Sequence, residues 1–451
     1  MRTKVTSFKF SVFFLSFMLL AFCFGLPGTA LSIPAFDVNK LSDMSGFDPA
    51  ASIEPAGDVV KLGYMNIFSG PGAENGVLNV MSLKWAAYDI NKRGGIIVDG
   101  KKKKIRVMIG DTQGKPAMTK KVAEKFCLED KVDVLIGTPG SHLTLVIQNV
   151  AKKYKTIHLN DRGVSEALMN AQNFSRYTFR SCITTAMFGQ AMAYYYSKRP
   201  EKKFYILCQD YSYGHDIANS FKAALKKYKP DHEIVGDEYH PLFMKDFAPY
   251  LTKARGAGAE VIYTGDWMPD GGNLVVQAHN LGVDLPIANL YADTYANLQA
   301  IGPEAGKTMV NGNTHMVSID NPDFKKLNKI WHNLWKSKWT RPYDHANYKW
   351  IGGVYGENMV SSYWLIGIIE EAGSTDPEKI ITTWEGDEYK TFNGVVKMRA
   401  CDHQIVRDVF VSQFEYPNPW FDDAASYGKV FTVPADICAQ PIPADLDRCK
   451  Q

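Results

Sequence analysis

Residues 59–92 read VVKLGYMNIFSGPGAENGVLNVMSLKWAAYDINK, and this stretch decides the fold class. Its first part, Val59 to Ile67, is an apolar run typical of a strand, and Val80 to Lys92 has the pattern of a helix. The residues between them are polar and glycine-rich, as is typical of a loop. Strands that alternate in this way with helices predict a parallel sheet covered by helices on both faces.

The same alternation continues along the chain and starts again after Arg180. Further strands are predicted at 105–110, 132–136, 203–208 and 260–264, and further helices at 118–128, 143–153, 186–196 and 217–227. Residues 324–372 return to long amphipathic helix patterns, and residues 395–415 to alternating strands. Two such blocks predict an α/β protein with two doubly wound, Rossmann-like lobes.

The composition is that of an ordinary globular protein. Of the 451 residues, 45% are hydrophobic and 22% are charged, which supplies enough apolar material for two or three packed cores. The formal net charge is +3, and three basic residues lie within the first thirty, which contain no acid. Without that stretch the chain is neutral, so nucleic acid is not an expected partner. The run Lys101 to Lys104 is interpreted as a solvated turn between two strands rather than as a phosphate-binding patch.

The amino terminus has the pattern of a signal peptide, predicted to span residues 1–30. Arg2, Lys4 and Lys9 precede an apolar run, and Gly28 to Ala30 supplies small residues for cleavage. A lipoprotein that uses Cys23 is the less favoured alternative, because Phe22 stands where a small residue should precede the cysteine. No later stretch approaches the roughly 18 apolar residues of a membrane helix, so the mature protein is expected to be soluble and periplasmic. Residues 31–57 are interpreted as a flexible lead-in.

Six cysteines follow the predicted signal peptide. An even number in an exported chain permits disulfides, although six thiols allow fifteen pairings and the sequence does not choose among them. Cys438 and Cys449 are the favoured pair, because they lie close together in a proline-rich tail that has little core of its own. The alternative to disulfides is that all six cysteines are small, buried side chains with free thiols.

No signature of catalysis or of a bound cofactor is present in the sequence. The ten histidines form no HExxH motif and no Cys/His cluster, so no metal site is predicted. Gly70, Gly72 and Gly76 follow a strand, but their spacing is wrong for a dinucleotide fingerprint and Pro71 lies among them. A phosphate-binding GxxxxGK[ST] loop and a GxSxG elbow are also absent. The protein is therefore expected to be a binder rather than an enzyme.

Several segments carry a resemblance to a known family. They are KLG at 61–63, SGP at 69–71, AAYDINKRGGI at 86–96, VDVLIG at 132–137, DYSYG at 210–214 and RACDHQ at 399–404. Their order along residues 58–415 resembles the type I periplasmic binding proteins, and in particular the branched-chain amino acid (Leu/Ile/Val) binding subgroup. The resemblance implies two lobes joined by three hinge crossings, closure around a ligand and delivery to an ABC-type membrane permease.

On this basis lobe 1 is predicted to comprise residues 58–180 and 317–394, and lobe 2 residues 181–316 and 395–432. Residues 433–451 remain as a C-terminal tail. A monomer is expected. A ligand-sensing module that serves a receptor or chemoreceptor is the alternative function, although such an ectodomain would need a membrane helix after the module.

The resemblance also implies a ligand-binding site. Ser141, at the loop after the third strand, would offer its hydroxyl to an anionic group, and Ser141 is also a plausible N-cap. Asp161 and Arg162 follow the fourth strand, where Arg162 would pair with a carboxylate or would be a surface arginine bridged to Asp161.

Five further positions complete the predicted site. In the second lobe, Tyr213 and Trp267 would cover apolar faces of the ligand, Asp266 would lie in the same loop as Trp267, and Asp293 would receive an ammonium. Asn75 stands where binders of hydrophobic amino acids often have an aromatic residue. These polar side chains predict a compact polar ligand, such as an amino acid or a related amide or organic acid, rather than a purely aliphatic one.

Overall fold

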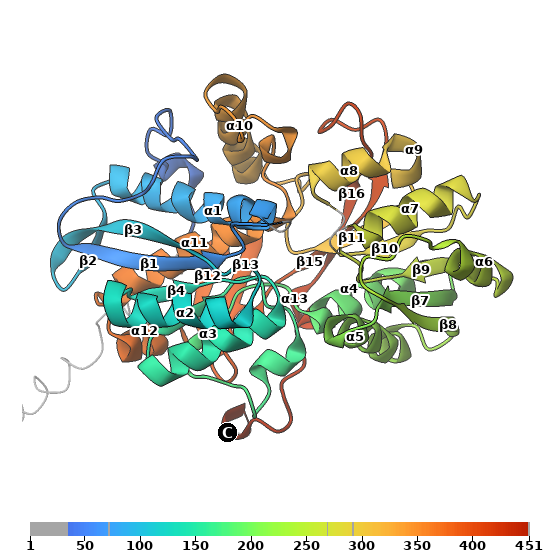
Figure 1. The fold of residues 1–451 in the computed structure, drawn as a ribbon, viewed down its shortest axis with the longest axis horizontal. Coiled ribbons are helices and arrows are strands. Elements are labelled where there is room, and N and C mark those ends of the chain that lie inside the picture. The colour runs from blue at the N-terminus through green and yellow to red at the C-terminus, as the bar shows by residue number, and fades with distance from the viewer. Residues whose placement is uncertain (1–34, 71–72, 268, 291–292, 450–451) are drawn as a thin grey trace, which may run out of the picture. The chain divides into compact units, whose positions relative to one another are not determined.

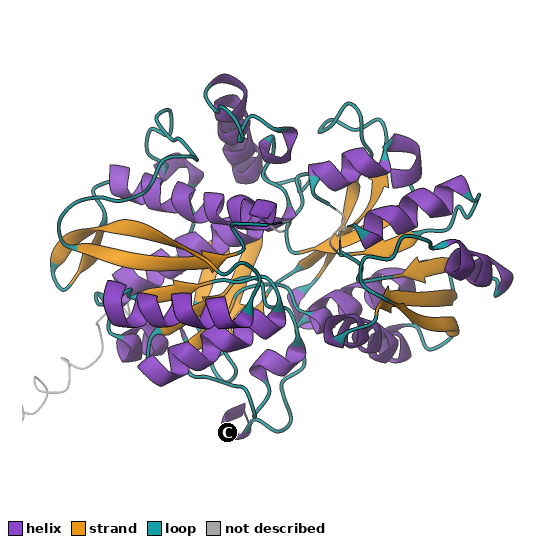
Figure 2. Ribbon diagram, viewed as in Figure 1, coloured by secondary structure: helices purple, strands orange, loops and turns teal. Residues whose placement is uncertain are grey.

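The computed structural model describes residues 35–449 except 71–72, 268 and 291–292, and its two larger β-sheets each form the centre of one lobe (Figure 1). The predicted signal peptide, residues 1–30, lies outside the described residues. Helices cover both faces of each of these sheets (Figure 2). The α/β class and the two doubly wound lobes predicted from the alternating pattern are confirmed.

The sheet of lobe 1 has six strands in the order β2-β3-β1-β4-β5-β6. All neighbours in it are parallel except the hairpin of β2 and β3. The elements are β1 (Val59–Asn66), α1 (Ala73–Lys92), β2 (Ile96–Val98), β3 (Lys101–Asp111), α2 (Pro116–Lys125), a π-helical turn (Phe126–Asp130), β4 (Val134–Ile136), α3 (Ser141–Tyr154), β5 (Ile157–Asn160), a 3₁₀ turn (Glu166–Met169) and β6 (Thr178–Arg180).

The sheet of lobe 2 has seven strands in the order β16-β15-β11-β10-β9-β7-β8. The pairs β11–β15 and β15–β16 are antiparallel, and the other neighbours are parallel. The elements are α4 (Thr185–Ser197), β7 (Lys203–Gln209), α5 (Ser212–Tyr228), β8 (Glu233–His240), α6 (Ala248–Gly256), β9 (Val261–Tyr263), α7 (Asp270–Asn280), β10 (Ile287–Asn289), α8 (Tyr295–Ile301), α9 (Pro303–Gly306), β11 (Met309–Asn313), β15 (Val409–Glu415) and β16 (Ser426–Val433).

The remaining elements lie between β11 and β15 and after β16. They are α10 (Pro322–Ser337), a 3₁₀ turn (Ala346–Tyr348), α11 (Gly353–Ala372), α12 (Pro377–Trp384), β12 (Glu388–Thr391), β13 (Gly394–Met398), β14 (Ile405–Val406), α13 (Ala435–Cys438) and a last 3₁₀ turn (Asp447–Cys449). Helix α11 packs against α1 and thereby belongs to lobe 1. Its apolar composition fits this position, because it is buried among the other helices of that lobe.

The chain passes between the two sheets three times: after β6, after β11 and before β15. Buried polar side chains tie these crossings together. The guanidinium of Arg180, at the end of β6, donates to Gln404 Oε1 and to Ser165 O, and that of Arg407 donates to Thr314 O at 2.8 Å. Both arginines are at most 1% exposed. The hydrogen bonds of Arg180 offset a large loss of hydration, whereas Arg407 Nε and Nη1 are buried without a hydrogen-bond partner.

The helix and strand positions agree with most of the predicted ones. The predicted strand Val59 to Ile67 is β1, and the helix predicted from Val80 begins earlier, at Ala73. The run Lys101 to Lys104 is not a turn. It forms the first residues of β3, where it pairs with β2.

The predicted flexible lead-in is wrong for residues 35–57. Phe47 is 2% exposed and packs edge-on against Trp85 of α1, with ring centroids 5.1 Å apart. Ile53 O accepts a hydrogen bond of 2.9 Å from Val107 N of β3. The apolar residues in 35–57 are scattered among polar ones without a helical or strand period, so the sequence did not indicate that they pack against lobe 1.

One predicted lobe boundary also differs from the observed arrangement. Strand β14 and all of β13 except Gly394 lie within residues 395–432, which were predicted to belong to lobe 2, but these strands form a three-stranded sheet with β12. Tyr389 of β12 stacks on Trp364 of α11, with ring centroids 6.1 Å apart, so this small sheet belongs to lobe 1.

The C-terminal tail is anchored by a disulfide other than the predicted one. Cys449 is bonded to Cys401, and Cys438 is a buried free thiol. The predicted pairing of Cys438 with Cys449 is therefore wrong. Closeness in sequence was a poor guide, because α13 places Cys438 against α4 whereas the last turn of the chain returns to residue 401.

Candidate functional site

The candidate site lies where the loops that follow parallel strands of the two sheets meet. In open α/β sheets the carboxyl ends of the strands are the usual place for a ligand. Gly137, which follows β4, allows the loops of lobe 1 to approach closely. Its φ is +121°, and a Cβ there would lie 2.0 Å from Met65 O of β1.

A buried ion pair lies at the centre of the site. Arg162 Nη1 is 3.2 Å from Glu357 Oε2, and the two side chains are 12% and 1% exposed. Glu357 Oε1 also accepts hydrogen bonds from Ile183 N (2.9 Å) and Thr314 Oγ1 (2.7 Å). Ile183 follows β6 and Thr314 follows β11, so one carboxylate of α11 holds two of the three crossings and Arg162.

Asp161 lies beside this pair with an unsatisfied carboxyl oxygen. Tyr64 donates a hydrogen bond of 3.1 Å to Asp161 Oδ2, whereas the buried Oδ1 has no hydrogen-bond partner. Burial raises the pKa of Asp161 to about 7, and the Arg162 guanidinium opposes this shift. The carboxyl group is therefore poised to gain or lose a proton near neutral pH.

Asp293 contributes a carboxylate from lobe 2. Its Oδ2 accepts hydrogen bonds from Tyr427 OH (2.5 Å) and Asn313 Nδ2 (3.2 Å). Burial raises the pKa of Asp293, against the opposing effects of Tyr427 and Arg162. Gly353, the first residue of α11, lies so close that a Cβ at this position would be 2.4 Å from Asp293 Oδ2.

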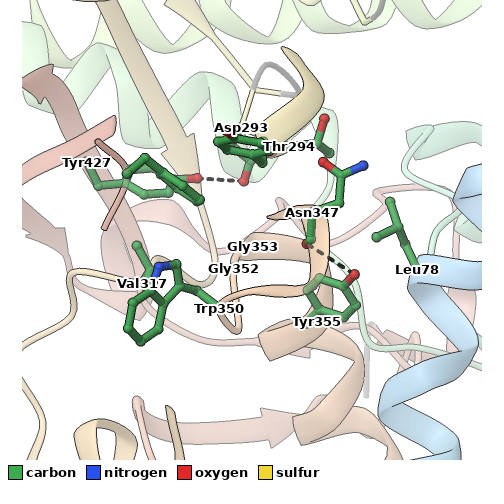
Figure 3. Close-up of a pocket in the computed structure, with 12 residues that line it drawn as sticks. Leu78, Asp293, Thr294, Val317, Asn347, Trp350, Gly352, Gly353, Tyr355 and Tyr427 are labelled. Carbon is green, nitrogen blue, oxygen red and sulfur yellow. Dashed lines mark hydrogen bonds between the residues drawn. The ribbon is translucent and has the colours of Figure 1, made fainter. Parts of the chain in front are cut away.

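Asp293 is also part of the wall of a pocket (Figure 3). The lining residues are Leu78, Asp293, Thr294, Tyr295, Val317, Asn347, Trp350, Gly352, Gly353, Tyr355, Phe421 and Tyr427. In this view Asp293 and Tyr427 are joined by their hydrogen bond, and Trp350 and Tyr355 lie on the opposite side. Among these twelve described lining residues, Asp293 is the only Asp, Glu, Lys, Arg or His.

Comparison with known proteins assigns the chain to a family. A family model described as periplasmic binding protein matches residues 59–419. The chain belongs to the periplasmic binding protein family. A Leu/Ile/Val-binding protein homolog of Brucella melitensis is 24% identical over 85% of this chain and 90% of its own length.

Solved structures support the same fold. The leucine-, isoleucine-, valine-, threonine- and alanine-binding protein of Brucella ovis, in a closed conformation, gives a TM-score of 0.74 at 19% identity and covers 86% of this chain and 98% of its own. An ABC-transporter solute-binding protein from Rhodopseudomonas palustris, in complex with 3,4-dihydroxybenzoic acid, gives 0.69 at 21% identity, with 84% and 98% covered. The suspected relationship to the Leu/Ile/Val-binding subgroup is confirmed at the level of family and fold.

The binding-protein fold brings some of the predicted site residues together. Asp161, Arg162 and Asp293 lie near one another, since the charge of Arg162 affects the pKa of both carboxyl groups. Arg162 is not a surface arginine bridged to Asp161, because its carboxylate partner is Glu357. Asn75 lies in the first turn of α1, and its side chain is outside the described part of the structure.

Ser141 is placed differently from its predicted N-cap position. Gly140 is the N-cap of α3, and Ser141 is the first helical residue. Its Oγ accepts a hydrogen bond of 3.1 Å from Ser165 N, so the hydroxyl oxygen is engaged with the loop after β5.

Tyr213, a predicted site residue of lobe 2, points into its own lobe. Tyr213 is 6% exposed, and its hydroxyl donates to Gly265 O at 3.0 Å. The adjacent Tyr211 is less buried and accepts a hydrogen bond of 2.9 Å from Trp267 Nε1. Because α5 begins at Ser212, the helix turns Tyr213 inward, and Tyr211 is the tyrosine that accompanies the half-buried Trp267.

Asp266 is likewise enclosed within lobe 2. It is fully buried, and its Oδ2 is 2.7 Å from His240 Nε2. This pair joins the loop after β9, which also carries Trp267, to the end of β8, and the buried Oδ1 of Asp266 has no hydrogen-bond partner.

The sequence reasoning missed Glu357 and most of the pocket wall. Glu357 lies on a long helix rather than in a loop after a strand. The one available signal was an acid in the first half of a largely apolar helix, whose other acids lie at its end. Trp350 and Phe421 come from long connections without a strand or helix period.

In the described ranges, no group of three His, Cys, Asp or Glu residues is arranged to hold a metal ion. None of the helices described there combines the length and apolarity that a membrane span requires.

Proposed function

We propose that this protein is an exported, non-catalytic solute-binding protein that captures a small polar ligand between its two lobes and delivers it to an ABC-type permease. The observation that carries this proposal is the meeting of Arg162, Glu357 and Asp293, from loops and helices of both lobes, next to a pocket. Ligand-driven closure suits such a site, because a ligand held by both lobes gains its second set of contacts only when they approach.

The relatives support the transport role. They include proteins named as amino-acid binders and solute-binding proteins of ABC transporters solved with hydroxybenzoic acids. The basic and apolar start of the chain supports export to the periplasm. The proposed ligand contacts are Asp161, Arg162 and Asp293, with Ser141 and Trp267 at the margins.

A thermal-shift screen tests this function. The mature protein, residues 31–451, is heated with amino acids, short amides, alkylamines and aromatic or aliphatic acids in turn. A true ligand stabilises the native state by RT ln(1 + [L]/Kd), about 2.7 kcal/mol at one hundred times Kd, and so raises the melting temperature. If no compound in these classes raises it, the proposed function is wrong.

A further inference from the structure

Most of the residues that line the pocket beside Asp293 are aromatic or aliphatic. Five of its twelve lining residues are aromatic, namely Tyr295, Trp350, Tyr355, Phe421 and Tyr427. Leu78 and Val317 add aliphatic surface, and the remaining residues are small or polar. No lysine or arginine is among these described lining residues.

An aromatic wall with a single carboxylate suits a cation better than an anion. The faces of aromatic rings attract cations, most strongly when water is excluded, and such cages are used to recognise ammonium ligands. Asp293 supplies the counter-charge, and its Oδ2 already accepts hydrogen bonds from Tyr427 and Asn313, which hold the carboxylate in place.

Arg162, whose charge acts on both Asp161 and Asp293, is already engaged by a third acid. Arg162 is paired with the buried carboxylate of Glu357 at 3.2 Å. Asp161, beside that pair, adds a further acid with an unpartnered Oδ1. The acids Asp161, Asp293 and Glu357 outnumber the two arginines, Arg162 and Arg407, whose charges act on them. This excess of acids disfavours a ligand carboxylate.

One cation of the chain itself approaches two of the same rings. Lys349 Nζ lies 5.7 Å from the ring centroid of Trp350 and 5.8 Å from that of Phe421, although Lys349 does not line the pocket. These rings thus already present their faces to an ammonium group. The positive charge of Lys349 would repel a cationic ligand and attract an anionic one, which provides a test.

We propose that the pocket formed by Asp293 and its five aromatic neighbours takes the alkyl- or methylammonium group of a small organic cation, without requiring a ligand carboxylate. This inference rests on the proposed solute-binding function and names the chemical class of its ligand.

Isothermal titration with compounds of matched size tests the inference. Isobutylamine and tetramethylammonium carry a positive charge, isobutyramide is neutral, leucine is a zwitterion and 4-hydroxybenzoate is an anion. We expect at least one of the two cations to bind more tightly than the other three compounds. Tighter binding of leucine, isobutyramide or 4-hydroxybenzoate would overturn the inference but leave the solute-binding function intact. Failure of all five, together with a negative thermal-shift screen, would overturn both.

Two charge variants with opposite expected effects locate the binding site. Asp293→Asn is nearly isosteric and should weaken binding of the cation roughly tenfold, and Lys349→Met should strengthen it about two- to fivefold. Binding of an anion would respond in the opposite directions. Matched controls are Asp284→Asn and Lys325→Met, whose side chains are 74% and 62% exposed, and these should leave the affinity unchanged.

The aromatic contribution needs a separate variant. Trp350→Leu keeps an apolar side chain but removes the ring face, and it should weaken cation binding by roughly three- to tenfold. The melting temperature of each variant without ligand is measured to confirm that it is folded. An Asp293→Asn protein that is folded and binds the cation within about twofold of the parent would overturn the assignment of this pocket.

Discussion

Replacement of Glu357 by alanine should destabilise the protein strongly, because this carboxylate has three buried partners. Its Oε2 pairs with Arg162, and its Oε1 accepts from Ile183 N and Thr314 Oγ1. The variant removes all three contacts at the place where two crossings meet α11.

The magnitude follows from the burial of the partners. A buried donor left without an acceptor costs about 1–3 kcal/mol. Removing one member of a buried ion pair costs about 3–5 kcal/mol, because the other charge remains in a poorly hydrated position. Since the three contacts share one carboxylate, these values do not add, and we expect Glu357→Ala to lose roughly 3–5 kcal/mol. Glu357→Gln keeps an acceptor for Ile183 and Thr314 and should lose less.

Urea unfolding followed by tryptophan fluorescence and by circular dichroism measures this loss. The midpoint should fall without a change in slope, since the surface exposed on unfolding is the same. Glu304→Ala is the control, because Glu304 is 63% exposed in its pair with Lys307 and its loss should cost no more than about 0.5 kcal/mol. If Glu357→Ala loses less than about 1 kcal/mol, the crossings do not depend on this carboxylate.

Four further predictions rest on the contacts in the folded protein, each with its own measurement. The pKa of Asp161 is raised from 3.8 to about 7, so the folded state holds this proton more tightly than the unfolded state, and the resulting stability, complete below about pH 4, is lost as the pH rises to about 7. Urea unfolding between these pH values should show that the free energy of unfolding of the parent falls, and that it falls less in Asp161→Asn. If the two proteins lose stability equally with pH, Asp161 does not have the raised pKa. Gly353→Ala should weaken ligand binding in calorimetry by roughly tenfold, because its Cβ would lie 2.4 Å from Asp293 Oδ2, and unchanged affinity would mean that this close approach is not needed. Reduction of the Cys401–Cys449 disulfide should lower the free energy of unfolding by roughly 2–4 kcal/mol, whereas an unaltered urea midpoint would show that the tail does not stabilise the fold. Small-angle scattering should give a smaller radius of gyration with ligand than without it, and an equal radius would exclude closure.

The α/β class and the two lobes could be predicted from the sequence, because the pattern of apolar residues in each strand and helix is a local property of the chain. Strand β1 is a short apolar run that is largely buried on both faces, and helix α3 repeats its apolar residues with the helical period and buries that face. The packing of Phe47 on Trp85 has no such period, so the prediction treated residues 35–57 as a lead-in.

The candidate site could be predicted only in part, because loop position does not fix side-chain direction. Asp161, Arg162 and Asp293 follow strands, and the expected convergence at the strand ends brings them together. Tyr213 follows a strand as well, but the start of α5 turns its ring into the core of lobe 2.

Other features depend on contacts between segments far apart in the chain. The pairing of Glu357 with Arg162 joins positions 195 residues apart. The partner of Cys449 is 48 residues away, whereas the predicted partner, Cys438, is nearer in sequence. Neither contact leaves a pattern in a single sequence, because the residues that meet are brought together by the packing of whole lobes.

The most direct test of the central claim is equilibrium binding of a ligand that emerges from the screen, with recovery of that ligand afterwards. Calorimetry on the mature protein should give one ligand per chain, and mass spectrometry after prolonged incubation should recover the ligand chemically unchanged. Conversion of the ligand to a product, or the lack of saturable binding by any compound in the classes screened, would contradict the account of this protein as a solute-binding protein.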